Sequence, residues 1–151
     1  MFSIGVYHPK KEVNVGGLYR SAHLFGASLL FTIGRRYKEQ ASDTTKSTRH
    51  IPLIEYETFE QFAKLRPSNS ILIGVELTDK AIPLGKFWHP KNACYLFGAE
   101  DAGIPDSILG LCNKVIKIDY EFKASLNLAT SGGIVMHHRH LQINQTFGKV
   151  P

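Results

Sequence analysis

The sequence predicts an α/β protein with a mostly parallel sheet and helices on both faces. Short apolar runs alternate along the chain with segments of helical periodicity, which is typical of strand–helix units. The strand-like run Ile71–Leu77 carries a single charge, at Glu76, as expected where both faces of a parallel sheet are covered. The length of 151 residues suits one compact domain, so we expect a single domain over residues 1–151.

The first elements form a strand–helix–strand unit. Phe2–Tyr7 is an apolar run, Asn14–Phe25 has helical spacing, and Leu29–Ile33 is strand-like and ends at Gly34. Further alternation follows. The expected later strands are Ile51–Tyr56, Ile71–Leu77, Ala93–Phe97 and Val115–Ile118. The expected later helices are Phe59–Leu65, Pro105–Leu111, which has proline in its first turn, and Ser125–Leu141.

Composition excludes several classes of protein. The 43% hydrophobic and 21% charged fractions exclude a disordered or collagen-like chain. We find no apolar run of the twenty or so residues that span a bilayer, and no apolar leader. The expectation is a soluble, cytoplasmic protein without a membrane partner.

The positive charge is concentrated in one segment. Between Arg35 and Arg49, five basic residues stand against two acidic ones, which accounts for three of the chain's five net positive charges. Hydroxyl side chains are mixed with these basic residues, as they are where proteins contact a nucleic-acid backbone. The alternative is a solvated loop that keeps the protein soluble. The candidate RNA-binding residues are Arg35, Arg36, Lys38, Lys46 and Arg49.

Gly132 and Gly133 lie inside the last predicted helix, where each glycine costs about 1 kcal/mol relative to alanine. We expect the close approach of another backbone to offset this cost. That backbone belongs either to a loop of the same chain or to a second subunit.

Three short polar blocks stand at the ends of apolar runs. They are residues 14–22 (NVGGLYRSA), 98–104 (GAEDAGI) and 125–129 (SLNLA). Each block joins a strand to a helix, so the three should meet at the carboxyl edge of one sheet, where α/β proteins bind ligands.

In order and spacing, the blocks resemble the Asn-x-Gly-x-x-x-Arg-x-Ala, Gly-x-Glu-x-x-Gly and Ser-Leu-Asn signatures of the SpoU (TrmH) branch of the SPOUT RNA methyltransferases. The resemblance implies a C-terminal trefoil knot that binds S-adenosylmethionine, and an obligate homodimer. It also implies methylation of a ribose 2′-hydroxyl in tRNA or rRNA. The chain resembles the minimal members, which have no separate RNA-binding domain.

The resemblance also implies a set of cofactor-binding residues. Gly98 suits this role because a residue without Cβ lets a ligand approach the main chain, although a tight turn alone would also explain it. Ser125 and Asn127 stand at the start of the last helix, where capping by Ser125 is compatible with cofactor contact, and Glu100 either orders its loop or contacts the partner subunit. Asp119 stands where many members have proline. The expected cofactor contacts are Leu77, Thr78, Gly98, Glu100, Ile118, Ser125, Leu126 and Asn127.

The expected catalytic residues are Arg20, Asn14 and Ser125. Deprotonation of a guanidinium at pH 7 would cost about 9 kcal/mol, so Arg20 suits a cation that holds a phosphate and stabilises the developing alkoxide better than it suits a base. Proton removal then falls to water, Glu100 or Ser125. Asn14 either caps the first helix or contacts substrate, and the two roles have equal weight.

Two other functions stay open. A non-catalytic RNA-binding protein on the same fold would keep the basic surface and lose the cofactor. A nucleotide-dependent doubly wound enzyme is disfavoured because Gly-x-Gly-x-x-Gly does not follow the first strand.

Two further features have alternative explanations. We expect no metal at His137, His138 and His140, because a solvated or RNA-facing helix end explains that run of histidines. Phe87 and Trp88 either stack on a base or pack against the sheet edge.

Overall fold

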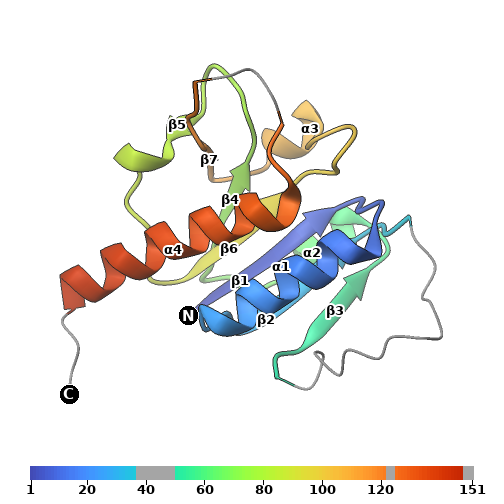
Figure 1. Cartoon of the computed structure of the whole chain (residues 1–151). Coiled ribbons are helices and arrows are strands. Elements are labelled where there is room, and N and C mark those ends of the chain that lie inside the picture. Colours follow the sequence, from blue (N-terminus) through green and yellow to red (C-terminus); the bar gives the residue numbers. More distant parts are fainter. Residues whose placement is uncertain (37–49, 122–124, 148–151) are drawn as a thin grey trace.

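Parallel strand pairing organises the computed structural model, which describes residues 1–36, 50–121 and 125–147 (Figure 1). The described residues form a seven-stranded sheet of order β3-β2-β1-β6-β4-β7-β5, and the strand pairs are all parallel, which confirms the predicted parallel sheet. The strands are β1 (Phe2–Tyr7), β2 (Leu29–Ile33), β3 (Leu53–Tyr56), β4 (Ile71–Val75), β5 (Ile82–Pro83), β6 (Ala93–Phe97) and β7 (Lys114–Lys117).

Helices cover both faces of this sheet. The helices are α1 (Glu12–Leu24), α2 (Phe59–Leu65), α3 (Asp106–Leu109) and α4 (Leu128–Phe147), with a short 3-10 helix η2 (Leu84–Lys86). Helices α1 and α4 lie side by side on one face, and α2 and α3 lie on the other (Figure 1).

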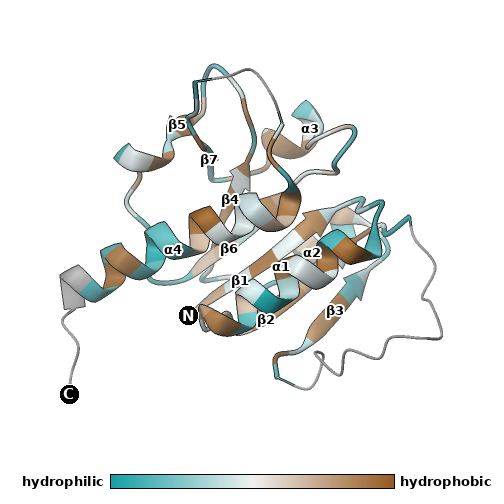
Figure 2. Cartoon of the chain, in the orientation of Figure 1, coloured by the Kyte–Doolittle hydropathy of each residue, from teal (hydrophilic) through white to brown (hydrophobic). Residues whose placement is uncertain are grey.

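The core consists of two apolar layers, because successive residues of a strand point to opposite faces. In β6, Tyr95 packs in the layer under α1 and α4, whereas Leu96 packs in the layer under α2 and α3. Figure 2 shows many hydrophobic residues along the central strands and mostly hydrophilic residues in the connections between elements. Because both layers exclude water from the strands, the loops at the strand ends are left to carry the polar chemistry.

Several boundaries match the prediction and others differ. The bounds of β1, β2, β6 and α2 agree with the expected runs. Strand β3 begins at Leu53 instead of Ile51, because the Tyr19 hydroxyl donates to the Ile51 carbonyl at 2.6 Å and accepts from its N–H at 3.0 Å. Strand β5 and helix η2 were not predicted, since a two-residue strand followed by one turn has no detectable periodicity.

Helices α1 and α4 pack closely through glycine. A Cβ on Gly132 would overlap the Leu18 side chain of α1, and a Cβ on Gly17 would lie 2.9 Å from that of Ala129. The expectation that a backbone approaches Gly132 is therefore wrong, because the space is filled by a side chain of the same chain. A Cβ on Gly133 would meet nothing within 4 Å in this chain.

Within the described residues, no helix is both long enough and apolar enough to cross a bilayer.

Candidate active site

A cleft of about 840 Å³ opens at the carboxyl edge of the sheet, where β4, β6 and β7 end. Its walls come from the loops after these strands and from the start of α4. The lining comprises residues 75–79, 97–103, 117, 118, 120, 125, 126, 128 and 131.

The cleft brings together most of the expected cofactor-binding residues. Those that line it are Leu77, Thr78, Gly98, Glu100, Ile118, Ser125 and Leu126. Several lining residues were not predicted, among them Glu76, Asp79 and Tyr120. Of these, only Glu76 had a sequence signal, as the lone charge in an apolar strand.

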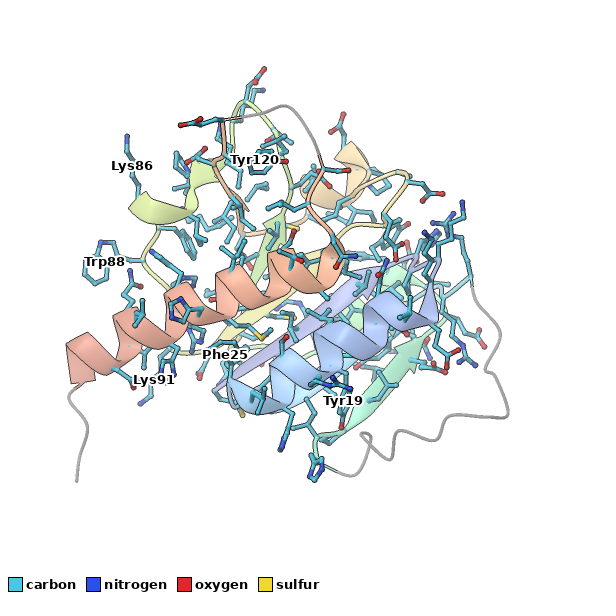
Figure 3. The ribbon with its side chains drawn as sticks, in the orientation of Figure 1. Tyr19, Phe25, Lys86, Trp88, Lys91 and Tyr120 are labelled. Carbon is cyan, nitrogen blue, oxygen red and sulfur yellow. The ribbon has the colours of Figure 1, made fainter. Side chains whose placement is uncertain are left out.

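Apolar side chains are open to solvent inside the cleft. Leu77 is 55% exposed, Leu126 38% and Tyr120 37%. Figure 3 shows Tyr120 in the upper part of the molecule, where the loops that follow β4 and β7 lie. A concave site with exposed apolar groups and a few polar ones is the usual form of a small-molecule site.

Asn127 is the expected cofactor residue that does not line the cleft. Its Oδ1 accepts hydrogen bonds from the N–H groups of Ala129 (2.9 Å) and Thr130 (3.3 Å), two of the donors in the first turn of α4 that have no partner within the helix. The cap is therefore Asn127 and not Ser125, which the sequence also allowed. Helix α4 begins at Leu128, so Asn127 occupies the capping position and Ser125 stays in the cleft wall.

The loop after β6 is a tight turn that requires two glycines. Ala99 and Gly103 exchange both main-chain hydrogen bonds, and Gly103 has φ +65°. A Cβ on Gly98 would overlap the Gly103 main chain, so this turn by itself requires glycine at position 98. Glu76 holds the turn from β4, because its Oε2 accepts from the Ile104 N–H at 2.8 Å.

One hydrogen-bonded group joins the three sequence blocks. Asn14 Nδ2 donates to Glu100 Oε1 at 2.7 Å, and Asn127 Nδ2 donates to Asn14 Oδ1 at 3.0 Å. The Lys10 N–H also donates to Glu100 Oε2 at 3.2 Å, which agrees with the loop-ordering role expected for Glu100. We call Asn14, Glu100 and Asn127 the amide–carboxylate triad. The triad places α1, the loop after β6 and the start of α4 at fixed relative positions.

Glu100 is a carboxylate held by donors. Burial alone would raise its pKa, but the hydrogen bonds from Asn14 and from nearby main-chain N–H groups outweigh burial and lower the pKa below its usual value. The group is therefore a negatively charged acceptor at neutral pH.

Asn14 does not cap α1, contrary to one of its two expected roles. The helix begins at Glu12 with Lys11 at the capping position, which places Asn14 inside the first turn. From there its side chain reaches the loop after β6 instead of the helix's own N–H groups.

Arg20 does not line the cleft of this chain. It is exposed on α1, six residues after Asn14 and hence on a different side of the helix. It forms no hydrogen bond or ion pair within the described parts of the chain. A single chain thus presents the guanidinium to solvent, outside the cleft.

The described part of the basic segment is tied to acidic partners. Arg36 forms two hydrogen bonds with the carboxylate of Asp101, at 2.6 and 3.2 Å, and Arg35 pairs with Glu55 at 2.8 Å. The Arg36 guanidinium holds the pKa of Asp101 well below its usual range. Asp101 also lines the cleft, so Arg36 connects the start of the basic segment to the cleft wall. Lys38, Lys46 and Arg49 lie outside the described residues.

Among the residues described, no group of three or more histidine, cysteine, aspartate or glutamate side chains is placed to hold a metal ion. His138 instead contacts another histidine, with its Nδ1 2.9 Å from Nε2 of His89.

The all-parallel sheet with a ligand-sized cleft at its carboxyl edge defines an α/β ligand-binding domain. Residues 1–137 match the sequence model of the SpoU rRNA Methylase family, so the chain belongs to that family.

One curated relative is the mouse tRNA (guanosine(18)-2'-O)-methyltransferase TARBP1, which is 26% identical over 135 residues. The match covers 83% of this chain but 8% of that protein, so the chain spans a small part of its length.

Solved structures share the fold. A structure concerned with 2-OH methylation of C/U34 on tRNA has a TM-score of 0.85 and 23% identity, and the match covers 96% of this chain and 97% of that one. The TrmH/SpoU tRNA modifying enzyme of A. aeolicus has a TM-score of 0.82 and 17% identity, covering 96% and 76%. An AdoMet-bound rRNA methyltransferase from Sinorhizobium meliloti has a TM-score of 0.81 and 21% identity, covering 97% and 56%.

Proposed function

We propose that the chain transfers a methyl group from S-adenosylmethionine to a ribose 2′-hydroxyl of tRNA or rRNA. Membership of the SpoU rRNA Methylase family supports the reaction class. The observation that carries the proposal is the amide–carboxylate triad, which joins the three signature blocks beside a ligand-sized cleft. Relatives described as acting on tRNA and on rRNA support both RNA classes.

The cleft fits S-adenosylmethionine in size and chemistry. Its volume of about 840 Å³ lies within the range of small-molecule sites. Leu77, Ile118 and Leu126 offer apolar surface for an adenine ring, and the main chain of the loops after β4 and β6 offers polar groups that orient the ligand. The bound cofactor supplies a methyl group on a positively charged sulfur, so the protein supplies orientation and handles the proton of the hydroxyl.

In this proposal Arg20 acts as a cation. A guanidinium binds phosphate through two parallel donors and stabilises a developing alkoxide without losing its own proton. Ser125 lies in the cleft wall and Glu100 is a carboxylate at its edge. Water and Ser125 are the candidate proton acceptors, because the hydrogen bonds that lower the pKa of Glu100 make its carboxylate a weak base.

The proposal includes a homodimer. The position of Arg20 outside the cleft of its own chain supports a site completed by a second copy. Exposed apolar residues on α1 and α4 also support an interface there, since Val13 is 76% exposed, Leu141 46% and Ile134 38%. The C-terminal trefoil knot, the single domain over residues 1–151 and the cytoplasmic location belong to the same proposal.

The test is methyl transfer to RNA followed by nucleoside analysis. Purified protein is incubated with labelled S-adenosylmethionine and total tRNA or rRNA, and the digested RNA is examined by mass spectrometry. We expect label in one 2′-O-methylated nucleoside, loss of transfer in Arg20→Ala, and strong impairment in Arg20→Lys, because lysine lacks the two parallel donors.

Two results would contradict this account. Full activity in Arg20→Lys would exclude the two-donor role of Arg20. RNA binding without any binding of S-adenosylmethionine in calorimetry would favour the non-catalytic RNA-binding alternative.

A further inference from the structure

Trp88 is the single tryptophan of the chain, and it is 73% exposed. Its two neighbours are buried, with Phe87 6% exposed and His89 7% exposed. A large aromatic side chain contributes most when it is covered, because its ring carries a large apolar area. Of the two alternatives considered for these residues, packing against the protein therefore applies to Phe87, which lies in the core, and not to the exposed Trp88.

The main chain on both sides of Trp88 is held by α4. Gln142 forms hydrogen bonds with the residues on both sides of Trp88. Its Nε2 donates to the Phe87 carbonyl at 3.1 Å, and its Oε1 accepts from the His89 N–H at 2.6 Å. Arg139 donates to the carbonyls of Pro90 (2.7 Å) and Lys91 (2.9 Å). We call residues 84–92 the η2–β6 connection.

The buried His89 ring anchors the same connection from inside. Its Nδ1 pairs with the Tyr95 hydroxyl of β6, and its Nε2 lies 2.9 Å from His138 Nδ1 of α4. The backbone under Trp88 is therefore preorganised while the indole ring itself stays in solvent. Preorganisation lowers the entropic cost of binding to such a ring.

The surface around Trp88 is basic. Lys86 and Lys91 are both exposed, and Figure 3 shows them projecting from the same edge of the molecule as Trp88, which lies between them. The sequence contains no aspartate or glutamate from residue 80 to residue 99, and none in α4. The charge of this surface suits a polyanion.

This surface is separate from the cleft. None of residues 80–96 lines the cleft. Strand β6 begins just after the η2–β6 connection, and Gly98, at its other end, lines the cleft. A five-residue strand spans about 16 Å, so the connection and the cleft are separated by about that length. A flexible polynucleotide has the length to contact both places.

We infer that Trp88, Lys86 and Lys91 form a subsite for single-stranded RNA, in which one unpaired base stacks on the indole and the lysines contact adjacent phosphates. Aromatic rings between cationic side chains are the usual means by which proteins hold unpaired nucleotides. Duplex RNA does not fit this subsite, because its bases are already stacked inside the helix. The inference rests on the proposed function for the identity of RNA as the partner.

Because Trp88 is the single tryptophan, its fluorescence reports on this subsite directly. We would titrate the full chain with an oligouridylate of about ten nucleotides, within the usual site size for single strands. Stacking should quench the emission and protect it from iodide, whereas a duplex of the same length should leave both unchanged.

Variants then measure the contribution of each group by anisotropy of labelled oligouridylate. Trp88→Ala should weaken binding about 5- to 150-fold, the range for one stacked base, and Trp88→Phe should lose less. Lys86→Glu together with Lys91→Glu should reduce the slope of log K against log salt by about 1.4, the value for two phosphates of a single strand. Lys64→Glu, on the exposed surface of α2, is the control for reversal of one charge at another surface and should have little effect.

Two outcomes would overturn the inference. One is RNA binding that leaves Trp88 emission unchanged and is retained in Trp88→Ala. The other is a change of emission with protein concentration in the absence of RNA, which would identify the surface as a contact between copies of the chain.

Calorimetry with S-adenosylmethionine separates this inference from the proposed function. Trp88→Ala should bind the cofactor as the wild type does. If the wild type does not bind the cofactor but its Trp88 is still quenched by RNA, the proposed function fails and the subsite stands.

Discussion

The side chain of Asn14 donates a hydrogen bond of 2.7 Å to Glu100, which lies 86 residues further along the chain. Asn127 donates in turn to Asn14, so one residue from each sequence block takes part. These bonds tie the helix that carries Arg20 to the loop that walls the cleft. The relative placement of the two is therefore set by a few polar contacts as well as by the apolar core.

Replacement of Asn14 by alanine should loosen the cleft. Glu100 is a partly buried carboxylate, and the loss of a hydrogen bond to a charged group costs about 1 to 2 kcal/mol of folding free energy at such a site. We expect that loss in urea unfolding and weaker binding of S-adenosylmethionine in calorimetry. Asn69→Ala, at an exposed position before β4, is the control. Equal stability and affinity in the two variants would contradict a role for the triad.

Gly98→Ala should disrupt the cleft more strongly. The added methyl group would overlap the Gly103 main chain, which cannot move without opening the turn after β6. We expect affinity for S-adenosylmethionine to fall more than about tenfold, equivalent to about 1.4 kcal/mol. A Cβ on Gly85 would meet nothing within 4 Å, so Gly85→Ala should bind normally. An unchanged affinity in Gly98→Ala would place the cofactor site elsewhere.

The neighbouring glycines of α4 should respond in opposite directions. Gly132→Ala should lose about 1 kcal/mol or more of stability, because its methyl group would overlap the fully buried Leu18. Gly133→Ala should gain about 0.5 to 1 kcal/mol from helix propensity, since the space around it is open within the chain. Urea unfolding measures both changes.

Gly133→Leu tests the proposed dimer in the same helix. If a second subunit approaches Gly133, leucine should weaken self-association in analytical ultracentrifugation. Unchanged folding and unchanged self-association would count against a close approach at this position.

The free energy of unfolding should fall in mild acid because of the buried His89. Burial, together with the nearby His138 and Arg139, lowers the pKa of His89 to about 3. Below about pH 6.5 the unfolded chain binds a proton that the folded chain does not bind, so folding is destabilised, by about 2 kcal/mol at pH 5. In urea unfolding at about pH 8 and pH 5, the wild type should lose about 2 kcal/mol more than His89→Gln. Equal losses in the two proteins would show that another group is responsible.

The sequence predicted the elements whose signal is local. β1, β2 and β6 are short apolar runs buried on both faces, and α2 has a Thr58 cap at its start and Pro67 after its end, so their limits could be predicted. The start of α4 was placed three residues too early, because Ser125 and Asn127 are both good capping residues and only the geometry selects Asn127.

The sequence was sufficient to predict which loops form the candidate site, but not which side chains in it contact one another. Leu77, Gly98 and Ile118 follow strands whose ends must meet at one edge, so their convergence follows from the parallel fold. The Asn14–Glu100 bond and the ion pair of Arg36 with Asp101 join residues far apart in the chain, and no periodicity encodes them. The same holds for the exposure of Trp88, which depends on how α4 holds its neighbours.

The central claim is that the cleft at the ends of β4, β6 and β7 holds the methyl donor next to the amide–carboxylate triad. The most direct test is a crystal structure of the protein grown with S-adenosylmethionine. We predict density for the donor between Leu77, Gly98 and Leu126, with the triad bonds intact. A donor bound at another surface, or an empty cleft under saturating donor, would contradict the account.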